Sequence, residues 1–260
     1  MANRSMKAIT AAAALAVLSA VSAMAQNTND TIAAPGGAIT VHAIHHASLM
    51  LTWNGKHVLV DPAPVSEARG LDPAAGYKAL PRPDAIVITH VHGDHFSVPI
   101  IEAVAGRDTV IVAPREVYDA LPADLKARTK VLKNGGKDVV DTIPIEAVPA
   151  YNTTPDRTKF HPKGAGNGYV LTFGAKRVYI AGDTEEAPEL AHLPNIDAAF
   201  LPMNLPYTET VQAAAKWVKD FKPGVVYPYH FRNADGTMSD MAAFKKDVGG
   251  ASEVRVLGWY

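Results

Sequence analysis

Residues 89–96 read THVHGDHF and place three of the chain's 10 histidines beside an aspartate: His90, His92, Asp94 and His95. They directly follow the apolar run Ala85–Ile88, which has the composition of a buried strand. Imidazole and carboxylate groups together suit Zn²⁺ and related divalent ions, whereas all-oxygen sites suit calcium or magnesium. A solvated histidine-rich turn is the alternative interpretation, but such a cluster is rare by chance. The stretch therefore predicts a metal site directly after a strand.

Two later apolar runs also end at a potential ligand. Asp183 follows the run RVYIAG, and His230 follows the run VVYPY. A side chain just beyond the carboxyl end of a strand has a rigid support and faces the cleft where α/β sheets usually bind ligands. His90 and His92 are two residues apart, so an extended backbone places them on one face. We therefore expect these strand ends to meet around one centre.

Short β-rich runs alternate with helical patterns from residue 39 onward. Strands are predicted at residues 39–44, 49–53, 57–60, 85–89, 110–113, 143–148, 169–173, 177–181, 198–201, 225–229 and 253–257. The clearest helix is predicted at residues 208–221, with others at residues 99–105, 115–120, 188–192 and 240–246. An antiparallel start followed by βα alternation predicts an α/β chain in which helices sandwich the sheets.

Residues 1–25 have the layout of a secretory signal peptide. Arg4 and Lys7 precede an alanine-rich apolar run, and small residues stand at both positions before a cleavage point at Ala25. The run of about 14 residues is shorter than the ~20 that a spanning helix needs, which disfavours a membrane anchor. We predict cleavage near Ala25 and export, either to a periplasm or as a secreted protein, with no transmembrane segment remaining. Residues 26–38 are predicted to be a flexible lead-in and residues 39–260 a single domain.

The composition narrows the classes of function. Hydrophobic residues make up 48% and charged residues 20%, with a formal net charge of −1, as in ordinary globular chains with a sizeable core. No cluster of lysine and arginine appears, so a small-molecule substrate is expected rather than a nucleic acid. The chain has no cysteine, which excludes disulfides, thiolate ligands and a thiol nucleophile.

The histidine motif, the sequence Gly182-Asp183-Thr184 and the strand-end His230 together resemble the metallo-β-lactamase-fold hydrolase superfamily. Asp61, in VLVDP, is similar to the aspartate that ends an early strand in that superfamily. The resemblance covers about Ile39 to His230 and implies an αββα sandwich of two mixed β-sheets flanked by helices. Three shorter stretches, IHHAS, LPMN and YPYH, resemble a branch that includes L-ascorbate-6-phosphate lactonase and the N-acylphosphatidylethanolamine-hydrolysing phospholipase D.

The resemblance also implies a role for each matching residue. His90 and His92 would hold a first metal. Asp94, His95 and His230 would hold a second, and Asp183 would bridge both. Asp61 would hydrogen-bond a ligand imidazole and fix its tautomer. The expected cofactor is two zinc ions, with a single zinc ion, Mn²⁺ or Fe²⁺ as the alternatives.

One position departs from the family pattern. The first metal normally takes a third histidine from a strand end, which in the related branch follows Pro-Ala-x, and Asn152 stands at that position. A neutral amide is a poor Zn²⁺ ligand, and the nearest downstream histidine is His161. We hypothesise that His161 supplies the missing ligand; a substrate contact or a plain loop histidine is the alternative. His46, directly before a predicted strand, is a further candidate to line the cleft.

The implied activity is hydrolysis by a metal-activated water that Asp94 orients. The branch resemblance favours a lactone or ester, or a phosphodiester, as the substrate. A β-lactamase is less favoured because some enzymes of that kind use a cysteine ligand. Two other classes stay open: a degenerate metal- or ligand-binding relative without turnover, and two-iron redox chemistry, which usually needs a flavin partner domain.

Overall fold

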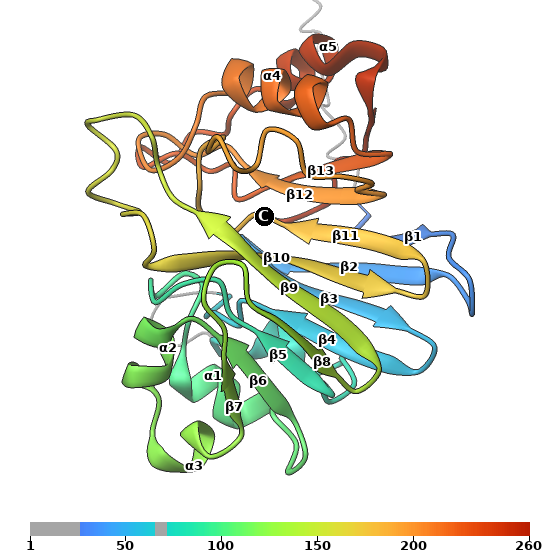
Figure 1. Ribbon diagram of the computed structural model, residues 1–260, viewed down its shortest axis with the longest axis vertical. Helices are drawn as coiled ribbons and strands as arrows, with labels where there is room; N and C mark the ends of the chain where they lie inside the picture. The colour runs from blue at the N-terminus through green and yellow to red at the C-terminus, as the bar shows by residue number, and fades with distance from the viewer. Residues whose placement is uncertain (1–26, 66–71) are drawn as a thin grey trace, which may run out of the picture.

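The computed structural model describes residues 27–65 and 72–260 (Figure 1). The predicted signal peptide, residues 1–25, lies outside the described residues. The described chain forms two sheets of seven strands each. The first sheet contains, in spatial order, β1 (Asn29–Ile32), β2 (Ile39–His45), β3 (Ser48–Trp53), β4 (Lys56–Val60), β5 (Ala85–Val87), β6 (Val110–Ala113) and β7 (Thr129–Val131). The second contains β14 (Glu253–Val254), β13 (Val225–Tyr229), β12 (Ala198–Pro202), β11 (Lys176–Ile180), β10 (Gly166–Phe173), β9 (Ile143–Ala150) and β8 (Lys137–Val140).

Both sheets are mixed, with an antiparallel half and a parallel half. In the first sheet β1 to β4 pair antiparallel and β4 to β7 pair parallel. In the second sheet β8 to β11 pair antiparallel and β11 to β14 pair parallel. The carboxyl ends of the parallel strands in a sheet share one edge, which makes that edge a platform for loops.

Helices cover the outer faces of the two sheets (Figure 1). Beside β5–β7 lie α1 (Val98–Val104), α2 (Arg115–Ala120) and α3 (Ala123–Lys126). Beside β12 and β13 lie α4 (Val211–Phe221) and α5 (Met241–Val248). Short 3₁₀ turns are formed by Ala75–Tyr77 and Gly249–Ala251. The predicted αββα sandwich of two mixed sheets is confirmed. Within residues 27–65 and 72–260, no helix combines the length and apolarity needed to cross a membrane.

The two-residue period of the strands separates the core into two layers. Val58 and Val60 of β4 pack into the larger cluster between the sheets, whereas Leu59 packs into the smaller cluster on the opposite face. On β5, Val87 packs into the larger cluster and Ile86 into the smaller one. Each fully buried side chain of this size contributes roughly 1.5–3 kcal/mol, so a shift of register by one residue is strongly disfavoured. This rigid packing holds the strand ends in place.

The expectation that residues 26–38 form a flexible lead-in is wrong for β1. Asn29–Ile32 pairs antiparallel with β2, and polar side chains secure it from outside the strand. The Asp30 carboxylate accepts hydrogen bonds from the Tyr227 hydroxyl at 2.7 Å and from Arg255 at 3.0 Å. The polar composition that suggested a lead-in is therefore the composition of an edge strand held by distant partners.

Other differences concern short elements. Residues 188–192, predicted as a helix, form turns, and the N–H of Leu190 donates to the carbonyl of Ala187 at 2.8 Å. Pro194 disfavours helical backbone at the residue before it, which limits the segment to single turns. Strands β7 and β8 and helix α3 were not predicted, because three or four residues carry too little periodicity to detect.

Candidate metal centre

The strand ends that the sequence singled out meet at one edge of the sandwich. Asp61 follows β4 and the histidine motif follows β5. Asp183 follows β11 and His230 follows β13. The long loop between β9 and β10 brings in His161. Parallel neighbours thus supply most of the side chains, and a loop supplies one more.

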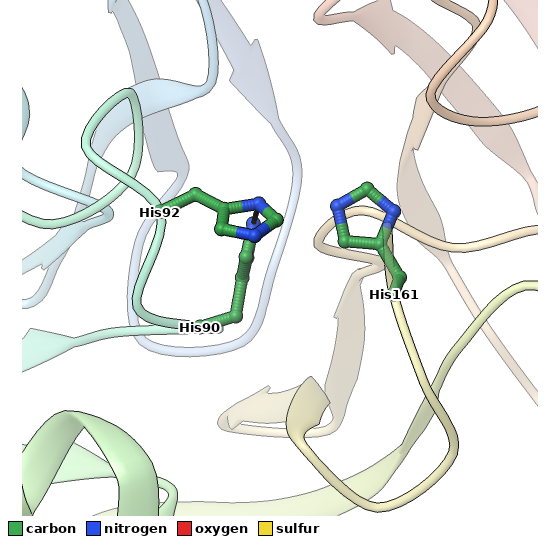
Figure 2. A group of neighbouring side chains, drawn as sticks. All are labelled: His90, His92 and His161. Carbon is green, nitrogen blue, oxygen red and sulfur yellow. Dashed lines mark hydrogen bonds between the residues drawn. The ribbon is translucent and has the colours of Figure 1, made fainter. Parts of the chain in front are cut away.

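His90, His92 and His161 form the first group of ring nitrogens. One nitrogen from each residue lies within 4.8 Å of the other two. Nε2 of His90 is 3.1 Å from Nδ1 of His92, and the centroid of the His161 ring is 5.0 Å from that of His92. Figure 2 shows His161 reaching the pair from the opposite side, on its own loop. This placement supports the hypothesis that His161 supplies the ligand missing at Asn152.

A buried carboxylate determines the shape of the loop that carries His161. Glu185 is 4% exposed, and its Oε2 accepts hydrogen bonds from the backbone N–H groups of Thr153 at 2.7 Å and Thr154 at 2.6 Å. Its Oε1 accepts from Arg157 Nη1 at 2.8 Å. Charge-assisted hydrogen bonds of this kind are roughly twice as strong as neutral ones. The loop is therefore held to the segment after β11 by an ionic contact with a buried carboxylate.

Asn152 and Tyr207 fix the ring of His161. The N–H of Asn152 donates to the carbonyl of His161 at 2.9 Å, and its side-chain amide donates to the carbonyl of Tyr207 at 2.7 Å. Nδ1 of His161 lies 3.2 Å from the same Tyr207 carbonyl and 3.2 Å from the side-chain nitrogen of Asn152, so both residues contact this side of the ring. Burial lowers the pKa of His161, which favours the neutral imidazole. Asn152, at the position where the family pattern has a histidine, thus helps to position His161.

Asp183 lies between the first group and a second group formed by Asp94, His95 and His230. Its Oδ2 is 3.4 Å from Nε2 of His161 and 3.4 Å from Nε2 of His230, and its Oδ1 is 3.2 Å from Nε2 of His95. Oδ2 of Asp94 is 3.3 Å from Nε2 of His230. The two oxygens of one carboxylate therefore contact ligand atoms of both groups, as a bridging carboxylate must.

Opposite charges stabilise each other within this cluster. Burial raises the pKa of Asp183, but the positive charges of His230 and His95 outweigh it and hold the pKa well below its usual range. Burial lowers the pKa of His95, but the Asp183 and Asp61 carboxylates raise it well above 6.5. The buried carboxylates thus favour positive charge at this point. A bound divalent ion would supply that charge in place of the ring protons.

The contacts in the cluster fit metal coordination better than hydrogen bonding. Four buried ligand atoms have no hydrogen-bond partner in the described part of the chain: Nε2 of His95, His161 and His230, and Oδ1 of Asp183. These atoms nevertheless lie 3.2–3.4 Å from another ligand atom. Two ligands on one tetrahedral zinc ion, each about 2.0–2.1 Å from the metal, stand roughly 3.3 Å apart. The side chains present therefore fit a divalent metal.

Residues 40–230 match the family model of the beta-lactamase superfamily domain. The chain belongs to the beta-lactamase superfamily. A UPF0173 metal-dependent hydrolase of Thermococcus onnurineus is 31% identical over 224 residues, covering 84% of this chain and 96% of that relative. A crystal structure from Parabacteroides distasonis, provisionally named a metal-dependent hydrolase, is 42% identical with a TM-score of 0.76, covering 88% of this chain and 97% of the other. Igni18, a metallo hydrolase of Ignicoccus hospitalis, matches at 24% identity and a TM-score of 0.67, covering 84% and 94%, and shows the fold alone.

Asp61 contacts the cluster through hydrogen bonds to His95 and Thr89. It is fully buried, and its carboxylate accepts hydrogen bonds from Nδ1 of His95 at 2.8 Å and from the N–H and hydroxyl of Thr89, both at 2.7 Å. Nε2 of His95 is thereby left to face Asp183. The backbone of Asp61 has a φ of 45°, in the left-handed region that costs free energy for a residue other than glycine. The structure therefore identifies His95 as the imidazole that Asp61 orients.

His46 lies against the second group but has protein partners on both ring nitrogens. Nε2 is 3.2 Å from Oδ2 of Asp94, and Nδ1 is 2.9 Å from the hydroxyl of Tyr260. Its ring centroid is 3.7 Å from that of His230. Burial, followed by the charge of His230, lowers the pKa of His46 to about 4, so the ring is neutral at pH 7. His46 could join Asp94 and His230 around a metal, but its saturated nitrogens favour a supporting contact.

Cavities open on either side of these residues. One of about 230 Å³ borders His90, His161 and Phe160, and another of about 290 Å³ borders Asp94, Asp183 and Asn204 (the second also reaches Tyr207). The proposed ligands that line these two spaces are His90, His92, Asp94, His161 and Asp183. Sequence reasoning missed Glu185 and Tyr260. The stretch Asp183-Thr184-Glu185, with a second acid past the strand end, was the available signal for Glu185, whereas Tyr260 had no such signal.

Proposed function

We propose that this chain is a metal-dependent hydrolase that binds two zinc ions and cleaves a lactone, an ester or a phosphodiester. The observation that carries the proposal is the set of buried, unpartnered ligand atoms at the spacing of a coordination tetrahedron. The hydrolase names of the relatives support the reaction class. The completeness of the ligand set argues against a degenerate binding protein without turnover.

The first set of proposed ligands is one of the groups that the structure brings together, and the second set follows the sequence resemblance. His90, His92 and His161 would hold the first ion; Asp94, His95 and His230 would hold the second; Asp183 would bridge them. A histidine-rich set with few carboxylates favours zinc over calcium or magnesium, with Mn²⁺ and Fe²⁺ as alternatives. If His161 did not ligate, a single-zinc centre at the second position would be the outcome.

When bound, the two ions supply Lewis-acid charge to the attacked group and make a water acidic near neutral pH. The protein's part is to orient that water. The Asp94 side chain is 48% exposed, and its Oδ2 is committed to His46 and His230, so its Oδ1 is available to accept a hydrogen bond from the water. Asn204 borders the neighbouring cavity, and its Oδ1 accepts from the Thr208 hydroxyl at 2.6 Å. The amide nitrogen of Asn204 is then the group that can donate to a substrate oxygen.

The sequence resemblance favours a lactone or phosphodiester over a β-lactam, and the cavities of a few hundred Å³ suit a small molecule. We further propose that the enzyme acts outside the cytoplasm, in a periplasm or after secretion, because residues 1–25 have the layout of a signal peptide.

Elemental mass spectrometry on the purified protein tests the metal proposal. About two zinc ions per chain are expected, and His161→Ala should lower that number; unchanged metal content in this variant would remove His161 from the ligand set. A panel of lactones, phosphodiesters and β-lactams, each assayed with and without a chelator, tests the activity. Absence of chelator-sensitive turnover on the whole panel would favour the binding-protein alternative.

A further inference from the structure

A third cavity borders the centre and has no part in the proposed chemistry. It has a volume of about 410 Å³ and is lined by polar side chains that include His45, His46, Asp94 and Arg232. Arg232 is two residues past His230, on the segment that follows β13. A permanent positive charge therefore stands beside the proposed second metal, where a substrate that reaches Asp94 would meet it.

The guanidinium of Arg232 is held in place by an aromatic ring. Its central carbon lies 4.3 Å from the centroid of the Tyr260 ring, within the range of a cation–π contact. The backbone N–H of Arg232 donates to the Tyr260 hydroxyl at 3.3 Å, and that hydroxyl also contacts Nδ1 of His46. Phe231 packs edge-on against the same ring at 5.2 Å. Arg232 is thus preorganised by the framework that orients His46.

No carboxylate compensates this charge in residues 27–65 and 72–260, where none lies within 4.0 Å of the Arg232 guanidinium. Asp94 borders the same cavity, but its carboxylate contacts His46 and His230 and belongs to the proposed ligand set. Burial, and then the charge of Arg232, lowers the pKa of His45, so this neighbour is a neutral donor or acceptor. With the proposed ions bound, the described residues and the ions that border the cavity would carry net positive charge.

We propose that Arg232 forms an oxyanion-binding subsite, so that the natural substrate carries a carboxylate or phosphate group beside the bond that is cleaved. The planar guanidinium matches both anions through paired N–H donors, which a lysine cannot reproduce. That the bound anion belongs to a substrate rests on the proposed hydrolytic function. Binding of an anion at Arg232 can be tested without turnover.

The binding test uses inorganic phosphate and succinate as probes, titrated into the zinc-loaded protein by calorimetry. Arg232→Met removes the charge at similar length, and Arg232→Lys keeps the charge without the fork. Arg107→Met is the control, since Arg107 is exposed on the loop before β6, at the opposite end of the parallel strands. Unchanged metal content and melting temperature establish that each variant is folded and loaded.

Arg232→Met should weaken the better-bound probe about 10-fold or more, Arg232→Lys should be intermediate, and Arg107→Met should stay within about twofold. The probe that loses more affinity identifies carboxylate or phosphate as the preferred anion. Equal affinity in the wild type and Arg232→Met would mean that the ions alone bind the probes, and this result would overturn the proposal. Failure of both probes to bind the wild type would overturn it as well.

A matched substrate pair separates this inference from the hydrolase proposal. 4-Nitrophenyl hydrogen succinate is anionic and 4-nitrophenyl butyrate is neutral, with the same leaving group. Arg232→Met should reduce the ratio of their kcat/KM values about 10-fold, through the anionic ester alone. Hydrolysis of neither ester by any form, combined with Arg232-dependent binding of the probes, would count against the hydrolase and not against the subsite.

Discussion

Glu185→Gln tests whether the loop anchor sustains the metal centre. Glutamine can keep one oxygen facing the N–H groups of Thr153 and Thr154, but its amide nitrogen then faces Arg157, which is also a donor. One charge-assisted hydrogen bond is lost, worth about 1.5–3 kcal/mol. For a domain of this size, that corresponds to a melting temperature lower by roughly 3–12 °C in the metal-free protein. If the loop opens at this cost, zinc binding at the first position weakens about 10- to 100-fold.

The assays are thermal unfolding of the metal-free chain and competition with a chelator for zinc. Glu189→Gln is the matched control, because Glu189 pairs with Lys163 at 2.6 Å on the same loop but its side chain is 40% exposed. Exposed pairs contribute roughly 0–1 kcal/mol, so this variant should bind zinc like the wild type. A destabilised Glu185→Gln protein with wild-type zinc affinity would refute the reasoning, since His161 would then reach the metal without its anchor.

The pH dependence of the same variant has a definite sign. Burial raises the pKa of Glu185, but hydrogen bonds from Thr154, Arg157 and Thr153 outweigh it and lower the pKa below 4.5. A depressed carboxyl pKa stabilises the fold above the unfolded value of about 4.3 and loses that contribution as the pH falls through the folded value. The stability difference between wild type and Glu185→Gln should therefore be constant near neutrality and shrink below about pH 4.

Three other substitutions have equally definite outcomes. Asp61→Asn leaves Nδ1 of His95 without its anionic acceptor and should weaken metal binding about 10- to 100-fold in chelator competition; unchanged affinity would contradict the role of Asp61. Gly182→Ala should cost about 2 kcal/mol or more in urea unfolding, because Gly182 has a φ of +68° and a Cβ there would lie 2.9 Å from that of Thr89. Burial raises the pKa of Glu209 well above 4.5, so the contribution of this carboxyl group to wild-type stability should decline as the pH rises above about 4.5. Glu209→Gln should remove this decline, and parallel melting curves against pH for the two proteins would exclude it.

The sequence predicted the strand-end part of the centre because each ligand ends an apolar run. His90, Asp183 and His230 could be placed at one edge from this pattern alone, since parallel strands bring their carboxyl ends together. The αββα sandwich followed from the family resemblance, and the topology confirms it. Periodicity and strand-end position are local properties, so one sequence is enough to detect them.

The parts that escaped prediction depend on contacts between distant residues. Glu185 reaches Thr153 and Thr154 across about 30 residues, and Tyr260 reaches His46 across 214. Neither contact leaves a periodic or motif signal in the chain. The N-terminal strand β1 was misjudged for the same reason, because its polar residues are stabilised by Tyr227 and Arg255.

If His161 is a metal ligand, the departure from the family pattern at Asn152 is compensated within one loop. A histidine at the end of β9 would be supported by the strand itself, whereas His161, nine residues further along, needs the loop to be ordered before it can bind. The asparagine bonds the backbone of His161 and shares the Tyr207 carbonyl with its ring, and Glu185 supplies the remaining order. In the proposed assignment, the first metal position would depend on loop stability through His161, whereas each proposed ligand of the second position lies on a segment that directly follows β5 or β13. Mutations that open the loop should therefore weaken the first position before the second.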